Sequence, residues 1–78
     1  MIVTVRLFAA LRELRGCEEL RCPIEPGATP QSLFVGLFGD GPLARLPVAY
    51  AVNAAYARGD QALRDGDEVA FLPPLGGG

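Results

Sequence analysis

The feature that most constrains this 78-residue chain is its last apolar segment, residues 68–72 (EVAFL), which is followed by Pro73 and Pro74. Consecutive positions of the segment are apolar, so a strand here needs cover on both faces. The two prolines remove two backbone N–H donors and end the ladder of hydrogen bonds. We therefore expect this strand to lie near the centre of a sheet, with other strands on either side.

Three earlier segments have the pattern of β-strands. Residues 2–8 (IVTVRLF) and 18–27 (EELRCPIEPG) alternate between apolar and polar side chains, and residues 48–53 (VAYAVN) are rich in apolar, strand-forming types. Pro23 lies inside the second segment and predicts an edge strand, or one whose pairing ends there. Residues 55–60 (AYARGD) are expected to form a turn or a short strand.

A short amphipathic helix is expected directly after the first strand. Leu7, Leu11 and Leu14 repeat at the spacing of one helical face, and charged side chains occupy the other face. Gly16 stands where a glycine in the left-handed conformation commonly ends a helix. With this helix in their connection, the first two strands can still pair as a hairpin.

The main helix is expected to begin at Thr29, a good N-cap residue, with Pro30 in the first helical position and Gly39 at its end. Gly36, inside this helix, costs about 1 kcal/mol relative to alanine, and we expect a close approach of the helix to the sheet to explain it. The apolar stripe consists of Leu33, Phe34, Leu37 and Phe38.

Together these segments predict one α+β domain with a mixed sheet of four to five strands. The main helix crosses one face of the sheet, and the short helix follows the first strand. A chain of this length supports a single domain. We assign residues 1–75 to the domain and residues 76–78 to a flexible C-terminal glycine tail.

The composition gives little support for an active site contained in this chain. Histidine and lysine are absent, and the single serine, Ser32, lies at the start of the main helix without a base to activate it. Asp65, Asp67 and Glu68 are close in sequence, but turn chemistry accounts for them. We expect this chain to bind no metal and no cofactor.

Cysteine usage and charge argue against further classes of site. Cys17 and Cys22 point to opposite faces of an extended segment, so we expect neither a disulfide nor a zinc site, with Cys22 buried. The net charge is −2 and the arginines are dispersed, which argues against nucleic-acid binding. No apolar run is long enough to span a membrane, and the N-terminus lacks the pattern of a signal peptide. We expect a cytoplasmic protein.

The C-terminus is the remaining candidate for chemistry. Gly76, Gly77 and Gly78 carry no side chains, and the α-carboxylate of Gly78 is ionised at neutral pH. Extended from Pro73, the end of the chain reaches about 20 Å. Such a thread can enter a slot in another protein that is only a backbone wide. The sequence therefore favours a carrier that delivers a group attached to its last carboxyl.

Three stretches, FAALREL (8–14), AVN (51–53) and DGDEVAFLPPLGGG (65–78), resemble the small subunit of molybdopterin synthase, a family of ubiquitin-like sulfur carriers. The resemblance runs essentially end to end and implies a ubiquitin-like β-grasp fold. It also implies that an activating enzyme uses ATP and magnesium to adenylate the Gly78 carboxylate, and that a sulfur donor then converts it to a thiocarboxylate.

The resemblance implies partners as well. In this family the carrier subunit is non-catalytic, and its sulfur passes to cyclic pyranopterin monophosphate in the large synthase subunit. The assembled synthase is a heterotetramer of two large and two small subunits. The large subunit, the activating enzyme and the sulfur donor are therefore the expected partners, with Gly76 and Gly77 threading the tail.

A carrier of this kind needs an apolar docking face, which the resemblance places near the tail, on the side of the sheet away from the main helix. Phe71 and Leu72 alternate, so only one of them can face outward, and we assign Phe71 to the core. Arg12 is expected on a solvated helix face. The predicted partner-binding residues are Phe8, Tyr56, Leu72, Pro73, Pro74 and Leu75.

Three alternatives stay open. The same chemistry would also serve a thiamine pathway or another sulfur-transfer route, although thiamine-type carriers typically lack the helical insertion FAALRELRG (8–16). A ubiquitin-like protein modifier would use Gly78 to attach to lysines of other proteins. A pure binding module would make the tail incidental.

Overall fold

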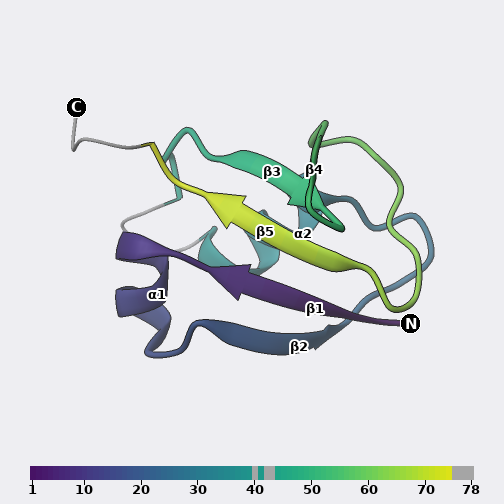
Figure 1. The fold of residues 1–78 in the computed structure, drawn as a ribbon, viewed down its shortest axis with the longest axis horizontal. Helices are drawn as coiled ribbons and strands as arrows, with labels where there is room; N and C mark the ends of the chain where they lie inside the picture. Colours follow the sequence, from purple (N-terminus) through teal and green to yellow (C-terminus); the bar gives the residue numbers. More distant parts are fainter. Residues whose placement is uncertain (40, 42–43, 75–78) are drawn as a thin grey trace.

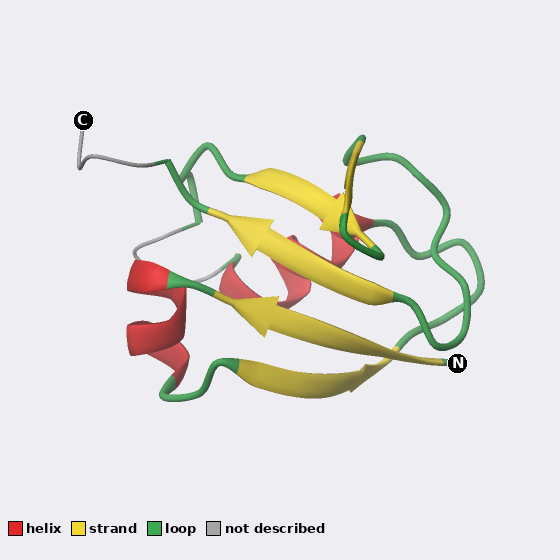
Figure 2. Cartoon of the chain, viewed as in Figure 1, coloured by secondary structure: helices red, strands yellow, loops and turns green. Residues whose placement is uncertain are grey.

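The computed structural model describes residues 1–39, 41 and 44–74, which form a five-stranded sheet and two helices (Figures 1 and 2). The strand order is β2-β1-β5-β3-β4, so the last strand lies in the middle and the strand that contains Pro23 lies at an edge, both as predicted. The elements in chain order are β1 (Ile2–Leu7), α1 (Ala9–Arg15), β2 (Glu19–Pro23), α2 (Pro30–Phe38), β3 (Ala49–Val52), β4 (Ala55–Ala57) and β5 (Glu68–Leu72).

The pairing of the strands makes this a mixed sheet. β1 is antiparallel to β2 and parallel to β5, and β3 is antiparallel to both β5 and β4. The predicted hairpin of the first two strands, with the short helix in its connection, is confirmed. Because Leu7 pairs with Phe71 in the parallel ladder, the chain leaves β1 and β5 at the same end of the sheet. That end brings Phe8 and Leu72 together.

The core lies between the sheet and α2, which covers one face of the sheet (Figure 1). Val3, Val5 and Leu7 are buried, which confirms the predicted alternation along β1. The rings of Phe34 and Phe38 on α2 pack against Phe71, which is fully buried, with centroid separations of 5.3 and 6.3 Å. Edge-to-face packing of this kind stabilises a small core beyond simple burial of area.

The N-terminus of α2 is held by side-chain and backbone contacts. The Thr29 hydroxyl accepts a hydrogen bond from the Ser32 N–H at 3.1 Å, and the Ser32 hydroxyl accepts one from the Thr29 N–H at 2.9 Å. This capping box satisfies two backbone donors and accounts for the only serine of the chain. The Gln31 N–H donates to the carbonyl of Gly59 at 3.0 Å, which ties the helix to the connection between β4 and β5.

Two details of the helix predictions are wrong. Gly36 is exposed, and a Cβ built on it would meet no neighbour within 4 Å, so no close approach to the sheet explains this glycine. In α1, Leu11 is fully buried, whereas Leu14 is 47% exposed. Figure 1 shows that α1 crosses the end of the sheet instead of lying on a face, so only its innermost side chain enters the core.

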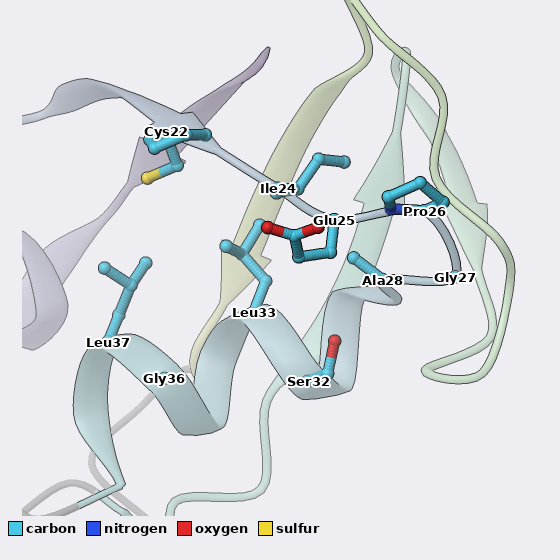
Figure 3. Close-up of a pocket in the computed structure, with 11 residues that line it drawn as sticks. Cys22, Ile24, Glu25, Pro26, Gly27, Ala28, Ser32, Leu33, Gly36 and Leu37 are labelled. Atoms are coloured by element: carbon cyan, nitrogen blue, oxygen red, sulfur yellow. The ribbon is translucent and has the colours of Figure 1, made fainter. Parts of the chain in front are cut away.

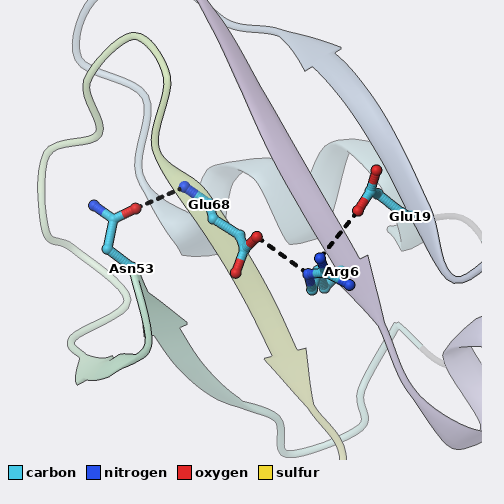
Figure 4. A network of polar contacts seen from close by, with 4 residues as sticks. All are labelled: Arg6, Glu19, Asn53 and Glu68. Atoms are coloured by element: carbon cyan, nitrogen blue, oxygen red, sulfur yellow. Dashed lines mark hydrogen bonds and ion pairs between the residues drawn. The ribbon is translucent and has the colours of Figure 1, made fainter.

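A polar network ties the turn before β5 to its neighbours on the open face of the sheet (Figure 4). The Glu68 carboxylate accepts from Arg6 Nε at 3.1 Å, and Arg6 also pairs with Glu19 at 3.2 Å. The hydrogen bond to Glu68 is the main cause that raises the pKa of Arg6. The side-chain Oδ1 of Asn53 accepts from the Glu68 N–H at 3.0 Å, and its side-chain Nδ2 donates to the Asp67 carboxylate at 2.9 Å.

Turn contacts occupy the two aspartates as predicted, since Asp65 accepts from the Ile2 N–H and Asp67 from the Arg64 N–H, both at 2.8 Å. The Glu68 carboxylate is instead held by Arg6 of β1.

Neither helix in the described ranges has the length and apolarity that crossing a membrane requires. Cys22 is buried, as predicted, Cys17 is half-buried, and both are free thiols. Burial raises the pKa of the Cys22 thiol.

Candidate functional site

A groove of about 430 Å³ opens at the end of the sheet where β1 and β5 finish, and we call it the tail-end groove. Its lining includes five of the six predicted partner-binding residues. The sixth, Leu75, lies outside the described residues, as do Gly76, Gly77 and Gly78. The residues that line the tail-end groove are Phe8, Ala9, Pro47, Ala49, Tyr56, Leu72, Pro73 and Pro74.

Phe8 is placed in the groove by a sharp turn between β1 and α1. It is the N-cap residue of α1 in extended conformation, and its carbonyl accepts from the Leu11 N–H at 3.1 Å. The next residue, Ala9, has a φ of 51°, which L-residues with a side chain adopt only at a cost. This turn leaves Phe8 42% exposed and lining the groove, outside the core.

Tyr56 also lines the groove. It lies on the edge strand β4 and is 83% exposed, the highest exposure among the large hydrophobic residues of the described chain. β4 is joined to β3 by a two-residue turn, in which Asn53 and Ala54 have φ values of 52° and 69°. An exposed tyrosine beside an apolar groove is typical of an anchor residue at a protein interface, because its ring buries a large area at little entropic cost.

Leu72 lines the groove from the sheet itself. It pairs with Ala49 of β3 and is half-buried, whereas Phe71 is fully buried on the other face. The assignment of Phe71 to the core and Leu72 to the outward side is confirmed. Pro73 and Pro74 continue directly from Leu72 along the groove, so the chain leaves the described fold from within this apolar surface.

Three lining residues, Ala9, Pro47 and Ala49, were not predicted. Ala49 enters through its pairing with Leu72, and Pro47 comes two residues before it. Small side chains and a proline in a loop carry no recognisable binding signal in a sequence. The register between β3 and β5 brings Pro47 and Ala49 to this place, and the pairing of β1 with β5 brings Ala9, which follows Phe8.

The tail-end groove contains no charged side chain among its described lining residues, and it offers no nucleophile activated by a base. No cluster of three or more His, Cys, Asp or Glu side chains suited to a metal ion occurs in the described ranges. The arrangement is suited to binding an apolar partner surface next to the point where the tail departs.

Comparison with known proteins gives a family match over most of the chain. The model of the ThiS family matches residues 5–78. The molybdopterin synthase sulfur carrier subunit of Chlamydomonas reinhardtii is 35% identical, with the full length of both chains covered. The protein of the same name from Arabidopsis thaliana is 33% identical over 97% of this chain and 82% of its own.

Solved structures agree with this match. A molybdopterin converting factor subunit 1 from Pyrococcus furiosus superposes with a TM-score of 0.82 at 28% identity, covering 96% of this chain and 99% of its own. The small archaeal modifier protein 1 of Haloferax volcanii gives 0.80 at 27% identity, covering 95% and 98%. A chain in the complex of subunits 1 and 2 of the molybdopterin-converting factor from Helicobacter pylori gives 0.66 at 27% identity, with both chains fully covered.

Proposed function

This chain belongs to the ThiS family, and from that premise we propose that it is the sulfur carrier subunit of a molybdopterin synthase. The relatives that match it over the full length carry this name. The fold is the ubiquitin-like β-grasp, and it carries the tail-end groove beside the exit of the chain. The position of that groove is the observation that carries the proposal, because a carrier must be gripped close to its reactive end.

In the proposed mechanism the reacting atom is the carboxyl carbon of Gly78. A carboxylate is a poor electrophile, so an activating enzyme joins it to AMP with the use of ATP and magnesium, and pyrophosphate leaves. A persulfide donor then attacks the acyl adenylate, a carbon–sulfur bond forms, and AMP leaves. Reductive cleavage of the sulfur–sulfur bond by a thiol gives the terminal thiocarboxylate. The chain itself supplies the acyl group and no catalytic side chain.

The proposed partner for delivery is a large synthase subunit, with cyclic pyranopterin monophosphate as the sulfur acceptor. The complex of two subunits known from Helicobacter pylori supports an assembly of this kind. We propose that the tail-end groove docks on the large subunit while Gly76 and Gly77 thread into its active site. The heterotetramer of two large and two small subunits, and the cytoplasmic location, are parts of the same proposal.

A second candidate function is attachment to other proteins. The likeness to the small archaeal modifier protein 1 supports it, since a modifier would use the same activated Gly78. The acceptor would then be an amine instead of a sulfur donor. A sulfur carrier for another pathway, such as thiamine synthesis, also shares the activation step and differs only in the acceptor.

The decisive measurement is the intact mass of the protein after incubation with ATP, the cognate activating enzyme and a sulfur donor. Replacement of one terminal oxygen by sulfur adds about 16 Da, and we expect this gain on the full chain. The chain that lacks Gly77 and Gly78 should show no gain. An unchanged mass of the full chain, with an activating enzyme of proven activity, would overturn the proposal.

Two further additions separate the candidate functions. Adding the large subunit and the pterin precursor to the thiocarboxylate form should return the mass to its starting value as sulfur is transferred. If instead the protein appears in covalent adducts with lysine-containing proteins and the precursor leaves the mass unchanged, the modifier function is favoured. The truncated chain should keep its thermal midpoint, because the described core extends only from Val3 to Phe71.

A further inference from the structure

A second groove, of about 570 Å³, lies between α2 and the segment where β2 ends (Figure 3). We call it the helix–edge groove. Figure 3 shows Leu33 and Leu37 pointing from α2 toward this segment, which contributes Cys22 and Ile24. None of its described lining residues belongs to the tail-end groove, and it lies on the helical side of the sheet. It is therefore a separate surface that the proposed sulfur transfer does not use.

Gly36 keeps this groove open. It lies on α2 between Leu33 and Leu37, and a Cβ at this position would point into space without a contact within 4 Å. Leu33 and Leu37, which line the same groove, are half-buried. A larger side chain at this position would take up space in the groove that these leucines line. The glycine thus costs helix stability and leaves an apolar floor exposed.

The groove adjoins the outer edge of β2, where backbone N–H and C=O groups point away from the sheet. Within the described sheet, β2 is the outermost strand on this side. Glu18 and Ile24 direct their backbone groups toward β1, through bonds of 2.9 Å to Leu7 and 2.7 Å to Met1. Because directions alternate along a strand, Glu19 and Arg21 direct their N–H and C=O groups outward.

Two features limit what the edge can accept. Pro23 has no N–H, so an added strand can pair only along Glu19 and Arg21 before its ladder ends. A strand paired there places every second side chain on the helical side of the sheet, toward Leu33 and Leu37. The only charged side chain among the described lining residues of the groove is Glu25. A ligand therefore needs alternate aliphatic residues and gains from a positive charge near Glu25.

We propose that the helix–edge groove and the outer edge of β2 together bind a short extended segment of a partner protein, with alternate aliphatic side chains and a neighbouring lysine or arginine. The segment adds a strand to the sheet, and backbone hydrogen bonds give affinity while the groove selects side chains. This surface goes beyond the sulfur-carrier function. It allows a partner to hold the carrier while the tail-end groove and the tail are engaged elsewhere.

The test is a selection of random short peptides, displayed on phage, against the immobilised full chain. We expect enriched peptides to alternate aliphatic residues beside a lysine or arginine. Their affinity should fall about tenfold or more for Gly36→Leu, whose side chain fills the groove. The matched control is Val35→Leu, at a position on α2 that is 58% exposed and outside the groove lining, and it should bind like the unaltered chain. Both variants keep the helix, because leucine is a better helix former than glycine or valine.

Two-dimensional NMR of the complex locates the peptide independently. The amide signals of Glu19 and Arg21 should shift and become protected from solvent exchange. The proposal is overturned if no peptide is enriched, if Gly36→Leu binds as well as the unaltered chain, or if Tyr56→Ala abolishes binding instead. The Gly36→Leu chain should still gain the mass of the thiocarboxylate, so failure here and failure of the sulfur-carrier function give different results.

Discussion

At the scale of single residues, the turn between β3 and β4 holds two residues in the left-handed backbone conformation, and only one of them gains a side-chain contact there. Asn53 and Ala54 both have positive φ values, as a two-residue hairpin turn of this type requires. Asn53 tolerates this conformation and uses its side chain to bridge to Asp67 and Glu68. Ala54 makes no such contact in the described structure. Its Cβ is strained in this conformation, which destabilises the turn.

We therefore expect Ala54→Gly to stabilise the protein by about 1 kcal/mol, because glycine adopts a φ of 69° without strain. In a domain of this size the thermal midpoint, followed by circular dichroism, should rise by about 4–8 °C. The neighbouring change Ala55→Gly places the same residue type in β4 and should lower the midpoint instead. Equal effects at the two positions would contradict the assigned turn.

The residue pattern alone predicted much at this scale. The alternation of Val3, Val5 and Leu7 identified their burial, and the apolar run of β5 identified the central strand. The role of Asn53 could not be predicted, because its partners lie 14 and 15 positions away in the sequence. Only the packing of the β3–β4 turn against the start of β5 creates those contacts.

At the scale of elements, α2 shows why a sequence predicts where a helix begins better than which side of it faces the core. Thr29 and Pro30 carry a local signal, and the structure has the cap where it was expected. Gly36 carries no such signal, since a glycine inside a helix fits a tight contact and an open groove equally well. The structure decides between them, because nothing lies within 4 Å of a Cβ there.

Gly36→Ala should accordingly stabilise the protein by about 1 kcal/mol, the difference in helix propensity between the two residues. The comparison is Gly59→Ala, where the added Cβ would lie 3.0 Å from the Tyr50 ring and 3.3 Å from the Gln31 Cβ. That change should destabilise the protein, because the loop that caps α2 must shift to accept it. Urea unfolding of the two variants measures both effects, and a destabilised Gly36→Ala would restore the interpretation of a close helix–sheet contact.

At the scale of the whole molecule, the parallel pairing of β1 with β5 creates the tail-end groove. It places residue 8 beside residue 72, and the antiparallel partner β3 adds Ala49 to the same end. The resemblance placed Phe8, Tyr56 and Leu72 on one docking face near the tail, and the structure shows that all three line one groove. That they line a single groove depends on strand order and register, which no local sequence pattern predicts.

The same arrangement places the residues that stabilise the fold and the residues proposed to dock on different sides of the sheet. The buried core lies on the side of α2, and the docking residues lie on the open side and at the end of the sheet. Tyr56 is mostly exposed, so Tyr56→Ala should change the free energy of unfolding by less than about 0.5 kcal/mol. Phe71→Ala removes a buried ring and should cost about 3–5 kcal/mol.

Tyr56→Ala, which has little effect on stability, should have a large effect on binding. An exposed aromatic residue at the centre of an interface commonly contributes 2 kcal/mol or more, so we expect Tyr56→Ala to weaken binding to a large synthase subunit by about tenfold or more. Val35→Ala is the matched control, because Val35 is also exposed but lies on α2, away from the tail-end groove. Isothermal titration calorimetry of the unaltered chain, Tyr56→Ala and Val35→Ala against the large subunit measures the affinity of each and shows which surface docks. If Val35→Ala weakens binding and Tyr56→Ala does not, the large subunit docks on the helical side, and the groove at the chain exit has another use.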